Sequence, residues 1–188
     1  MDSDLQNRWY ASAAKHSALQ ADMFHTGLIL EALRLSSPRV SSLQCSQPGS
    51  IINTNKHIRL TQDRPSQSGW LWSRLPLTPT SFEIEFEFRV DGKANSLYGD
   101  GFAMWLTRGR AQQGPVFGSV DQWEGLGVFF DTYANSRHAY VFPEVLAILN
   151  DGTKIYDVGK DGAGQELGRC SVSSAFARLY MPTDEPLI

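Results

Sequence analysis

The sequence has 188 residues, of which 41% are hydrophobic and 11% aromatic, and its formal net charge is −3. This length and apolar content support one domain with a sizeable hydrophobic core. The acidic balance and the lack of a Lys- or Arg-rich stripe exclude a phosphate-binding surface for nucleic acid. No run of about 18 apolar residues is visible to span a membrane, and the polar, acidic start, MDSDLQNRWY, does not resemble a signal peptide.

The first segment, through about Ser36, differs in composition from the rest of the chain. It is rich in Ala, Leu and Gln and lacks both proline and strand alternation, which indicates a helical or disordered extension. Pro38 and the Ser-rich stretch around it interrupt this pattern. We therefore expect an N-terminal extension over residues 1–40 and a folded domain over residues 41–188.

The second part of the sequence predicts short strands separated by turns. Alternation is clearest over residues 81–90, where Phe, Ile and Val alternate with Glu and Arg, so one face lies in the core. Residues 101–109 and 125–133 are more uniformly apolar, as central strands covered on both faces should be. Two further candidate strands cover residues 58–62 and 69–75.

Residues 145–157 have the pattern of a β-hairpin, because two β-rich halves are joined through Asn150, Asp151 and Gly152. No convincing helix follows Pro38. Many strands and frequent turns together predict an all-β fold, an antiparallel sandwich.

The acidic face of the alternating strand carries Glu83, Glu85 and Glu87. In jelly-roll β-glucanases, alternating carboxylates on one strand supply the acid and the nucleophile, so a glycosidase is one interpretation. The regular alternation and the neighbouring Arg89 fit a solvated sheet face equally well. We favour the solvated face and keep the glycosidase as the alternative.

Asp100 lies between Gly99 and Gly101, immediately before the first central strand. Flanking glycines permit backbone conformations that other residues avoid and let a ligand approach the chain closely. A plain turn at the start of a strand uses the same residues. Both interpretations stay open on this pattern alone.

The second central strand ends in a loop with Asp131, Tyr133 and Asn135 at every second position. Two side-chain oxygens on either side of a backbone carbonyl can converge on a hard cation such as calcium, and Asp161 could complete the shell from a later loop. Ordinary turn chemistry is the competing explanation, because Asp and Asn also hydrogen-bond their own backbone.

The large aromatic residues could stack on sugar rings, but most aromatics in a β-sandwich belong to the core. We expect the core for Trp72 and Trp105 in particular. The full set considered is Trp70, Trp72, Trp105, Trp123 and Tyr133.

The two cysteines, Cys45 and Cys170, do not form a zinc motif, which needs several clustered Cys or His ligands. One disulfide and two buried free thiols are both compatible with the sequence.

Four stretches occur in an order typical of one family. Between about residues 50 and 170 the chain resembles the L-type lectin domain of ER–Golgi cargo lectins, the intermediate-compartment and vesicular integral membrane lectins. The stretches are IRLTQDRPSQSGWLW, YGDGFAMWLTRGRAQQGPVFGSVDQWEGLGVFFDTYAN, VFPEVLAILNDG and YDVGKDG.

The resemblance implies a concanavalin-like antiparallel β-sandwich (a jelly roll) that binds high-mannose N-glycans of glycoprotein cargo with Ca2+, and is not an enzyme. It implies calcium ligation by Asp131, the Tyr133 carbonyl, Asn135 and Asp161. It also implies sugar hydrogen bonds from Ser66, Asp100 and Asn135, and a cis peptide bond before Asp100. Family members are usually type I membrane proteins, so the implied location is the endoplasmic reticulum and Golgi.

The sequence departs from the family pattern in three places. Val158 stands where the sugar-binding members have a histidine, which removes one sugar hydrogen bond. The family domain continues with further strands and a glycine-rich loop beyond the position of Ile188, so we expect an incomplete sandwich and a Cys170 without its family partner. The N-terminal segment replaces a signal peptide. These departures keep open a sugar-silent adaptor of the same fold that binds polypeptide.

Overall fold

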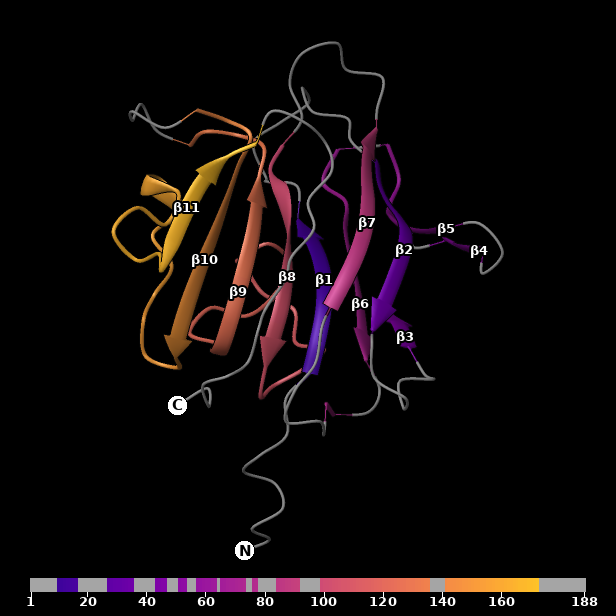
Figure 1. Ribbon diagram of the computed structural model, residues 1–188, viewed down its shortest axis with the longest axis horizontal. Helices are drawn as coiled ribbons and strands as arrows, with labels where there is room; N and C mark the ends of the chain where they lie inside the picture. The colour runs from indigo at the N-terminus through magenta and orange to yellow at the C-terminus, as the bar shows by residue number, and fades with distance from the viewer. Residues whose placement is uncertain are drawn as a thin grey trace, which may run out of the picture.

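The computed structural model describes residues 10–16, 27–35, 43–46, 51–53, 57–63, 65–73, 76–77, 84–91, 99–135 and 141–172. These residues form two antiparallel sheets and one 3-10 turn, η2 (Val158–Lys160) (Figure 1). The larger sheet has the strand order β11 (Gly168–Ser171), β10 (Glu144–Asp151), β9 (Glu124–Asp131), β8 (Gly101–Thr107), β1 (Tyr10–His16), β6 (Ser68–Ser73) and β3 (Leu43–Ser46). The smaller has the order β4 (Ile51–Asn53), β5 (His57–Thr61), β2 (Gly27–Leu35) and β7 (Ile84–Asp91).

The predicted all-β antiparallel architecture is confirmed, and so is the central position of two strands. β8 and β9 lie next to each other inside the larger sheet, and every residue of β8 is buried. β9 is buried at every position after Glu124. Uniformly apolar strands therefore occupy the positions with neighbours on both sides and cover on both faces.

The interpretation of the N-terminal segment as a helical or disordered extension is wrong for the residues that the structure describes. β1 pairs with β6 and β8, and β2 pairs with β5 and β7. Each segment therefore satisfies its backbone groups on both sides, and this tertiary pairing overrides the helix propensity of Ala and Leu. The boundary that we place between residues 40 and 41 stays a prediction.

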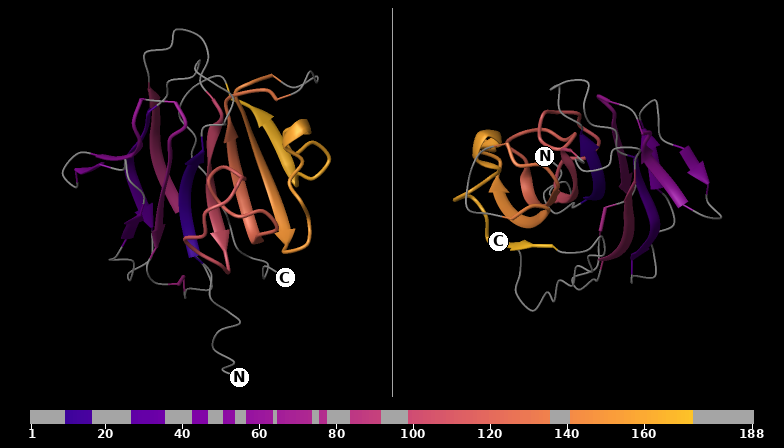
Figure 2. Two further views of the ribbon diagram at one scale, coloured as in Figure 1. Left: turned by 180° about the vertical axis from the view of Figure 1, so that it is seen from behind. Right: turned by 90° about the horizontal axis from the view of Figure 1, so that it is seen from above.

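Side-chain alternation along β8 and β9 divides the core into two layers. Phe102, Met104 and Val128 face the smaller sheet and pack in one cluster with Ile84 and Phe88. The two sheets are separate layers when the molecule is viewed from above (Figure 2). The intervening residues of β8 and β9 form a second cluster on the opposite face of the larger sheet, containing Trp70, Trp72, Ala103, Trp105, Val116, Phe117, Trp123, Phe129, Leu146, Ile148 and Tyr156.

The second cluster shows that most of the large aromatic residues belong to the core and are not exposed for stacking on sugar rings. Trp72 and Trp105 are 2% and 0% exposed, as expected for the core. Trp70 and Trp123 are also buried, so they do not offer a ring to a sugar. Of the set considered, Tyr133 alone is only half-buried in the part of the chain that the structure describes.

The predicted hairpin over residues 145–157 is wrong in its second half. Strand β10 ends at Asp151, and its neighbours in the sheet are β9 and β11. The Asn150 amide accepts hydrogen bonds from the N–H groups of Gly152 and Lys154 at 3.0 and 3.2 Å, which closes a turn. Tyr156 then packs into the second cluster, so its segment covers the sheet instead of extending it.

Strands β3 and β11 are the two edges of the larger sheet, and each carries one cysteine. Six spacings of about 4.8 Å separate these edges, which is far beyond the reach of a disulfide. Cys170 is an exposed free thiol, so the alternative of two buried thiols is wrong for this cysteine. The alternative of a Cys45–Cys170 bond is therefore excluded.

The candidate site residues lie near one end of the larger sheet, the upper end in Figure 1. The pairing registers place Ser68, His16, Gly101, Asp131 and Glu144 in one row across five strands. β6 and β8 begin at this row, β9 ends there and β10 begins there. Loops entering and leaving these strands therefore meet at one edge of the molecule.

Candidate cation and glycan site

Asp131, the last residue of β9, is the centre of the site. Its side chain is 1% exposed, and Oδ1 accepts a hydrogen bond from the Tyr133 N–H at 3.0 Å. Within the described residues, Oδ2 is buried and has no hydrogen-bond partner. Burial raises the pKa of Asp131 to about 8, against the lowering effect of the Tyr133 N–H, and the nearby charges of Asp161, Glu144 and Asp100 raise it further.

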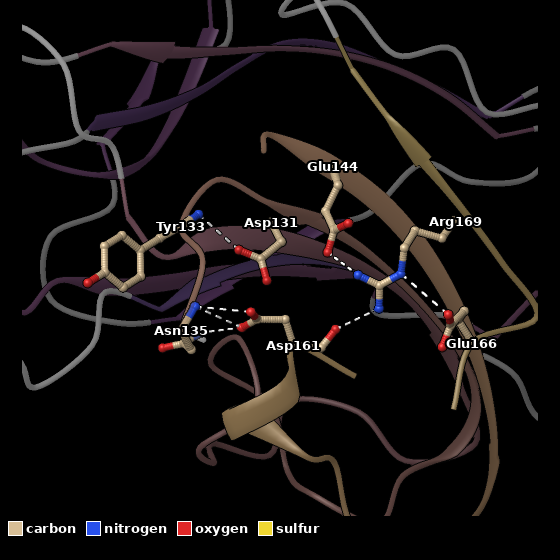
Figure 3. Close-up of polar contacts among 7 residues, drawn as sticks. All are labelled: Asp131, Tyr133, Asn135, Glu144, Asp161, Glu166 and Arg169. Carbon is tan, nitrogen blue, oxygen red and sulfur yellow. Dashed lines mark hydrogen bonds and ion pairs between the residues drawn. The ribbon is translucent and has the colours of Figure 1, made fainter. Parts of the chain in front are cut away.

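Asp161 is brought to this carboxylate from a later loop. It follows η2 in a left-handed conformation (φ 50°, ψ 43°) and is 0% exposed. The backbone N–H of Asn135 donates to Asp161 Oδ2 at 3.0 Å, and the Asn135 side-chain amide donates to Oδ1 at 2.6 Å. Figure 3 shows one oxygen of Asp131 directed toward Asp161, whose own carboxylate points to Asn135.

The fold thus brings together all four residues expected to ligate calcium. Among the described residues, no group of three His, Cys, Asp or Glu side chains is arranged to hold a metal ion. A cation here would also need the carbonyl of Tyr133 and an oxygen of Asn135; in this structure the side-chain nitrogen of Asn135, and not its oxygen, faces Asp161. Such a mixed set of oxygens suits a hard cation. The buried Oδ2 of Asp131, which has no hydrogen-bond partner among the described residues, is an oxygen that a cation would satisfy, so the residues present fit calcium.

Asp100 immediately precedes β8 and adjoins residues 131–135, which we call the cation loop. Its carbonyl accepts a hydrogen bond from the Thr132 N–H at 2.9 Å, and its side chain is half-buried. The peptide bond between Gly99 and Asp100 is cis, as the family resemblance implied. At Gly101, φ is +142° and an added Cβ would lie 2.2 Å from the Phe130 carbonyl oxygen. The close approach of the neighbouring strand is therefore sufficient to require a glycine here.

The three residues expected to bind sugar lie at the same end of the sheet. Asp100 adjoins the cation loop, and the exposed Asn135 lies in it. Ser66 is exposed in the turn before β6, with a positive φ of 54°. Because β6 and β8 are separated only by β1, this turn begins about 10 Å from Gly101.

The acidic strand of the glycosidase alternative lies elsewhere. Glu85 and Glu87 belong to β7, an edge strand of the smaller sheet, and Glu83 lies outside the described residues. The candidate cation site belongs to the larger sheet. The structure therefore does not bring this strand to the site.

Sequence reasoning missed a buried ionic network beside the site (Figure 3). Arg169, on β11, donates from Nη1 to Glu144 Oε1 and from Nη2 to the Asp161 carbonyl at 2.9 Å. Its Nε lies 3.4 Å from Glu166 Oε1. The signal for Glu144 was present, because it occupies the same strand face as Leu146 and Ile148, which are buried.

A two-layer antiparallel sandwich with an oxygen-rich loop at one end of its larger sheet is the arrangement of a legume-type lectin domain. Residues 39–181 match the sequence model of the legume-like lectin family, and the chain belongs to this family. Because this is a family of lectins, the chain is not an enzyme.

Several relatives are similar over much of the chain. An L-type lectin-like domain-containing protein of Schizosaccharomyces pombe is 42% identical over 156 residues, covering 80% of this chain and 50% of the relative. The VIP36-like protein of Mus musculus is 43% identical over 126 residues, covering 65% of this chain and 36% of the relative. The chain therefore spans half or less of the length of these relatives.

Solved structures show the same fold. The exoplasmic/lumenal domain of VIP36 in its Ca2+/Man-bound form is 37% identical, with a TM-score of 0.61, and the match covers 73% of this chain and 55% of that one. The Ca2+/Man2-bound form of the same domain is 36% identical with a TM-score of 0.58, covering 70% of this chain and 52% of that one.

Within the described residues, no helix is both long and apolar enough to cross a membrane.

Proposed function

We propose that this chain binds high-mannose N-glycans of glycoprotein cargo in a calcium-dependent manner, within a concanavalin-like jelly-roll sandwich. The observation that supports this most directly is the buried, unpartnered Oδ2 of Asp131 facing the carboxylate of Asp161. An arrangement of this kind is stable in its ionised form only with a cation between the carboxylates. The Ca2+- and mannose-bound forms of the VIP36 domain support the choice of ligand.

In this proposal Asp131, the Tyr133 carbonyl, Asn135 and Asp161 hold the cation. Bound calcium supplies the positive charge that balances two buried carboxylates. Asp161 holds the backbone and the side chain of Asn135 in place, so the exposed part of Asn135 is oriented before sugar arrives. Asn135, Asp100 and Ser66 then hydrogen-bond mannose hydroxyls.

A cargo lectin of this kind works between the endoplasmic reticulum and the Golgi, and we propose that location for the protein that contains this chain. The relatives include vesicular integral-membrane proteins. Glycoproteins with high-mannose glycans are the corresponding partners.

A sugar-silent, polypeptide-binding adaptor of the same fold is the second candidate. It is favoured by Val158, which is 49% exposed in the turn that leads to Asp161 and whose side chain offers no hydrogen-bonding group. This adaptor would bind calcium normally but would not bind mannose. The two candidates therefore differ in one measurable step.

That step is tested by glycan binding with and without calcium. The purified chain is titrated with a high-mannose oligosaccharide in calcium and again after chelation. Binding that requires calcium and is abolished in Asp131→Asn supports the lectin. Asp151→Asn is the matched control, because Asp151 is exposed at the opposite end of β10 from Glu144. Calcium binding without any glycan binding by a folded chain favours the adaptor instead.

A further inference from the structure

The side chain of Arg169 is almost fully enclosed, with 8% exposed. It makes three contacts in three directions: Glu144 through Nη1, the Asp161 carbonyl through Nη2 at 2.9 Å, and Glu166 near Nε at 3.4 Å. A planar guanidinium has donors in a fixed fork, so three partners at once define its position. The Arg169 side chain therefore links β10, β11 and the loop that carries Asp161 in one defined arrangement.

The two ends of Asp161 have separate partners. Its backbone carbonyl accepts from Arg169, while its carboxylate accepts from Asn135. The following residue, Gly162, is packed so closely that an added Cβ would lie 2.9 Å from the Tyr156 ring. Asp161 is consequently fixed by the core on one side and by the guanidinium on the other, and its carboxylate is aimed at Asn135.

Arg169 also provides a positive charge for Glu144, a third acidic residue next to the cation site. Glu144 is 1% exposed and is the direct cross-strand partner of Asp131, so its charge lies beside the cation site. Pairing with Arg169 gives Glu144 a counter-charge from the protein itself. A bound cation then has to balance only Asp131 and Asp161.

We propose that Arg169 is a positioning residue for the calcium site: it holds the Asp161 carbonyl and neutralises Glu144, so that the cation loop is preformed. This inference rests on the proposed function, because it concerns the affinity of the same site. Residues that orient metal ligands from outside the coordination shell typically change metal affinity by about 10–100-fold.

The test is Arg169→Lys, measured by calcium calorimetry well below the melting temperature. Lysine keeps the positive charge but cannot reach Glu144 and the Asp161 carbonyl with a fixed fork. We expect calcium affinity to fall about tenfold or more. Arg108→Lys is the control, because Arg108 forms a half-exposed ion pair with Glu124 at 3.0 Å, away from this end of the sheet.

A merely structural role for Arg169 would lower the melting temperature and leave the calcium affinity of the folded variant within twofold of the wild type. That result would overturn the inference while leaving the proposed function intact. No calcium binding by the wild-type chain would overturn both. If Arg169→Lys does not fold, the double variant Glu144→Gln with Arg169→Gln replaces it, because it removes both buried charges. We expect the same loss of calcium affinity in this double variant. A calcium affinity within twofold of the wild type would again contradict the inference.

Discussion

Asn135 donates hydrogen bonds from both its backbone and its side chain to the carboxylate of Asp161, a residue 26 positions later. This relationship joins the loop after β9 to the loop after β10. It brings the last expected cation ligand to the other three. The site therefore depends on the folding of two loops, and substitutions at their junction have predictable effects.

Substitution of Asp161 tests this junction directly. Asp161→Ala removes the acceptor for both Asn135 donors in a position that is 0% exposed. Because hydrogen bonds to charged groups contribute about 1.5–3 kcal/mol each, we expect a loss of several kcal/mol in the free energy of unfolding and no measurable calcium binding. Urea unfolding and calcium calorimetry check the two parts. A stable variant that binds calcium normally would contradict this role.

The pH dependence of the metal-free chain follows from Asp131. Its pKa is about 8 in the folded state, raised mainly by burial, and about 3.9 in the unfolded state. Because folding raises this pKa, the contribution of Asp131 to stability is fully present below about pH 4 and is lost as the pH rises through about 8. We expect unfolding midpoints in urea, measured in chelator, to decline over this range by an amount equivalent to a few kcal/mol.

Two comparisons isolate this effect. Asp131→Asn cannot ionise, so its metal-free stability should change less between pH 4 and pH 8 and should exceed that of the wild type at pH 8. Saturating calcium should flatten the curve of the wild type but not alter the variant. Parallel curves for the two proteins in chelator would show that Asp131 is not the group responsible.

Gly101 allows the close approach of β8 and β9 at the site. Gly101→Ala places a Cβ 2.2 Å from the Phe130 carbonyl oxygen at a φ of +142°. We expect a loss of about 3 kcal/mol or more in stability, because backbone on both sides must move. Gly168→Ala is the control, since a Cβ there has no heavy atom within 4 Å. Thermal melting of both variants tests this prediction. Equal melting temperatures for Gly101→Ala and Gly168→Ala would contradict the close packing of β8 against β9 at Gly101.

Val158→His should restore a sugar hydrogen bond. Val158 is 49% exposed in the turn that leads to Asp161, so the change should leave stability and calcium affinity unaltered. We expect glycan affinity to rise by about two- to tenfold, the equivalent of one hydrogen bond. Ile155→His, at a more exposed position of the same loop, is the control. An unchanged glycan affinity in the first variant would count against the assigned sugar site.

Much of the fold was predictable because local pattern and tertiary position agree. The alternation around Phe88 and the uniform apolarity around Trp105 and Phe129 correspond to an edge strand and two central strands. Strands β1 and β2 were not predictable, because their Ala- and Leu-rich sequences favour a helix until partners on both sides supply backbone hydrogen bonds.

Part of the candidate site was also predictable from local sequence, and part was not. The spacing of Asp131, Tyr133 and Asn135 indicated either a cation loop or an ordinary turn, with Asp161 as a further candidate ligand, and the family resemblance favoured the cation loop. The contact between Arg169 and Glu144 spans 25 positions and depends on the pairing of β10 with β11. No local pattern encodes that pairing, so the network became visible only in three dimensions.

Calcium titration calorimetry on the purified chain shows whether the loop after β9 binds a cation. We expect saturable binding to one site, with Asp131→Asn abolishing the heat of binding and Asp151→Asn leaving it unchanged. A folded wild-type chain that shows no binding would mean that Asp131, Tyr133 and Asn135 serve ordinary turn chemistry and hold no cation.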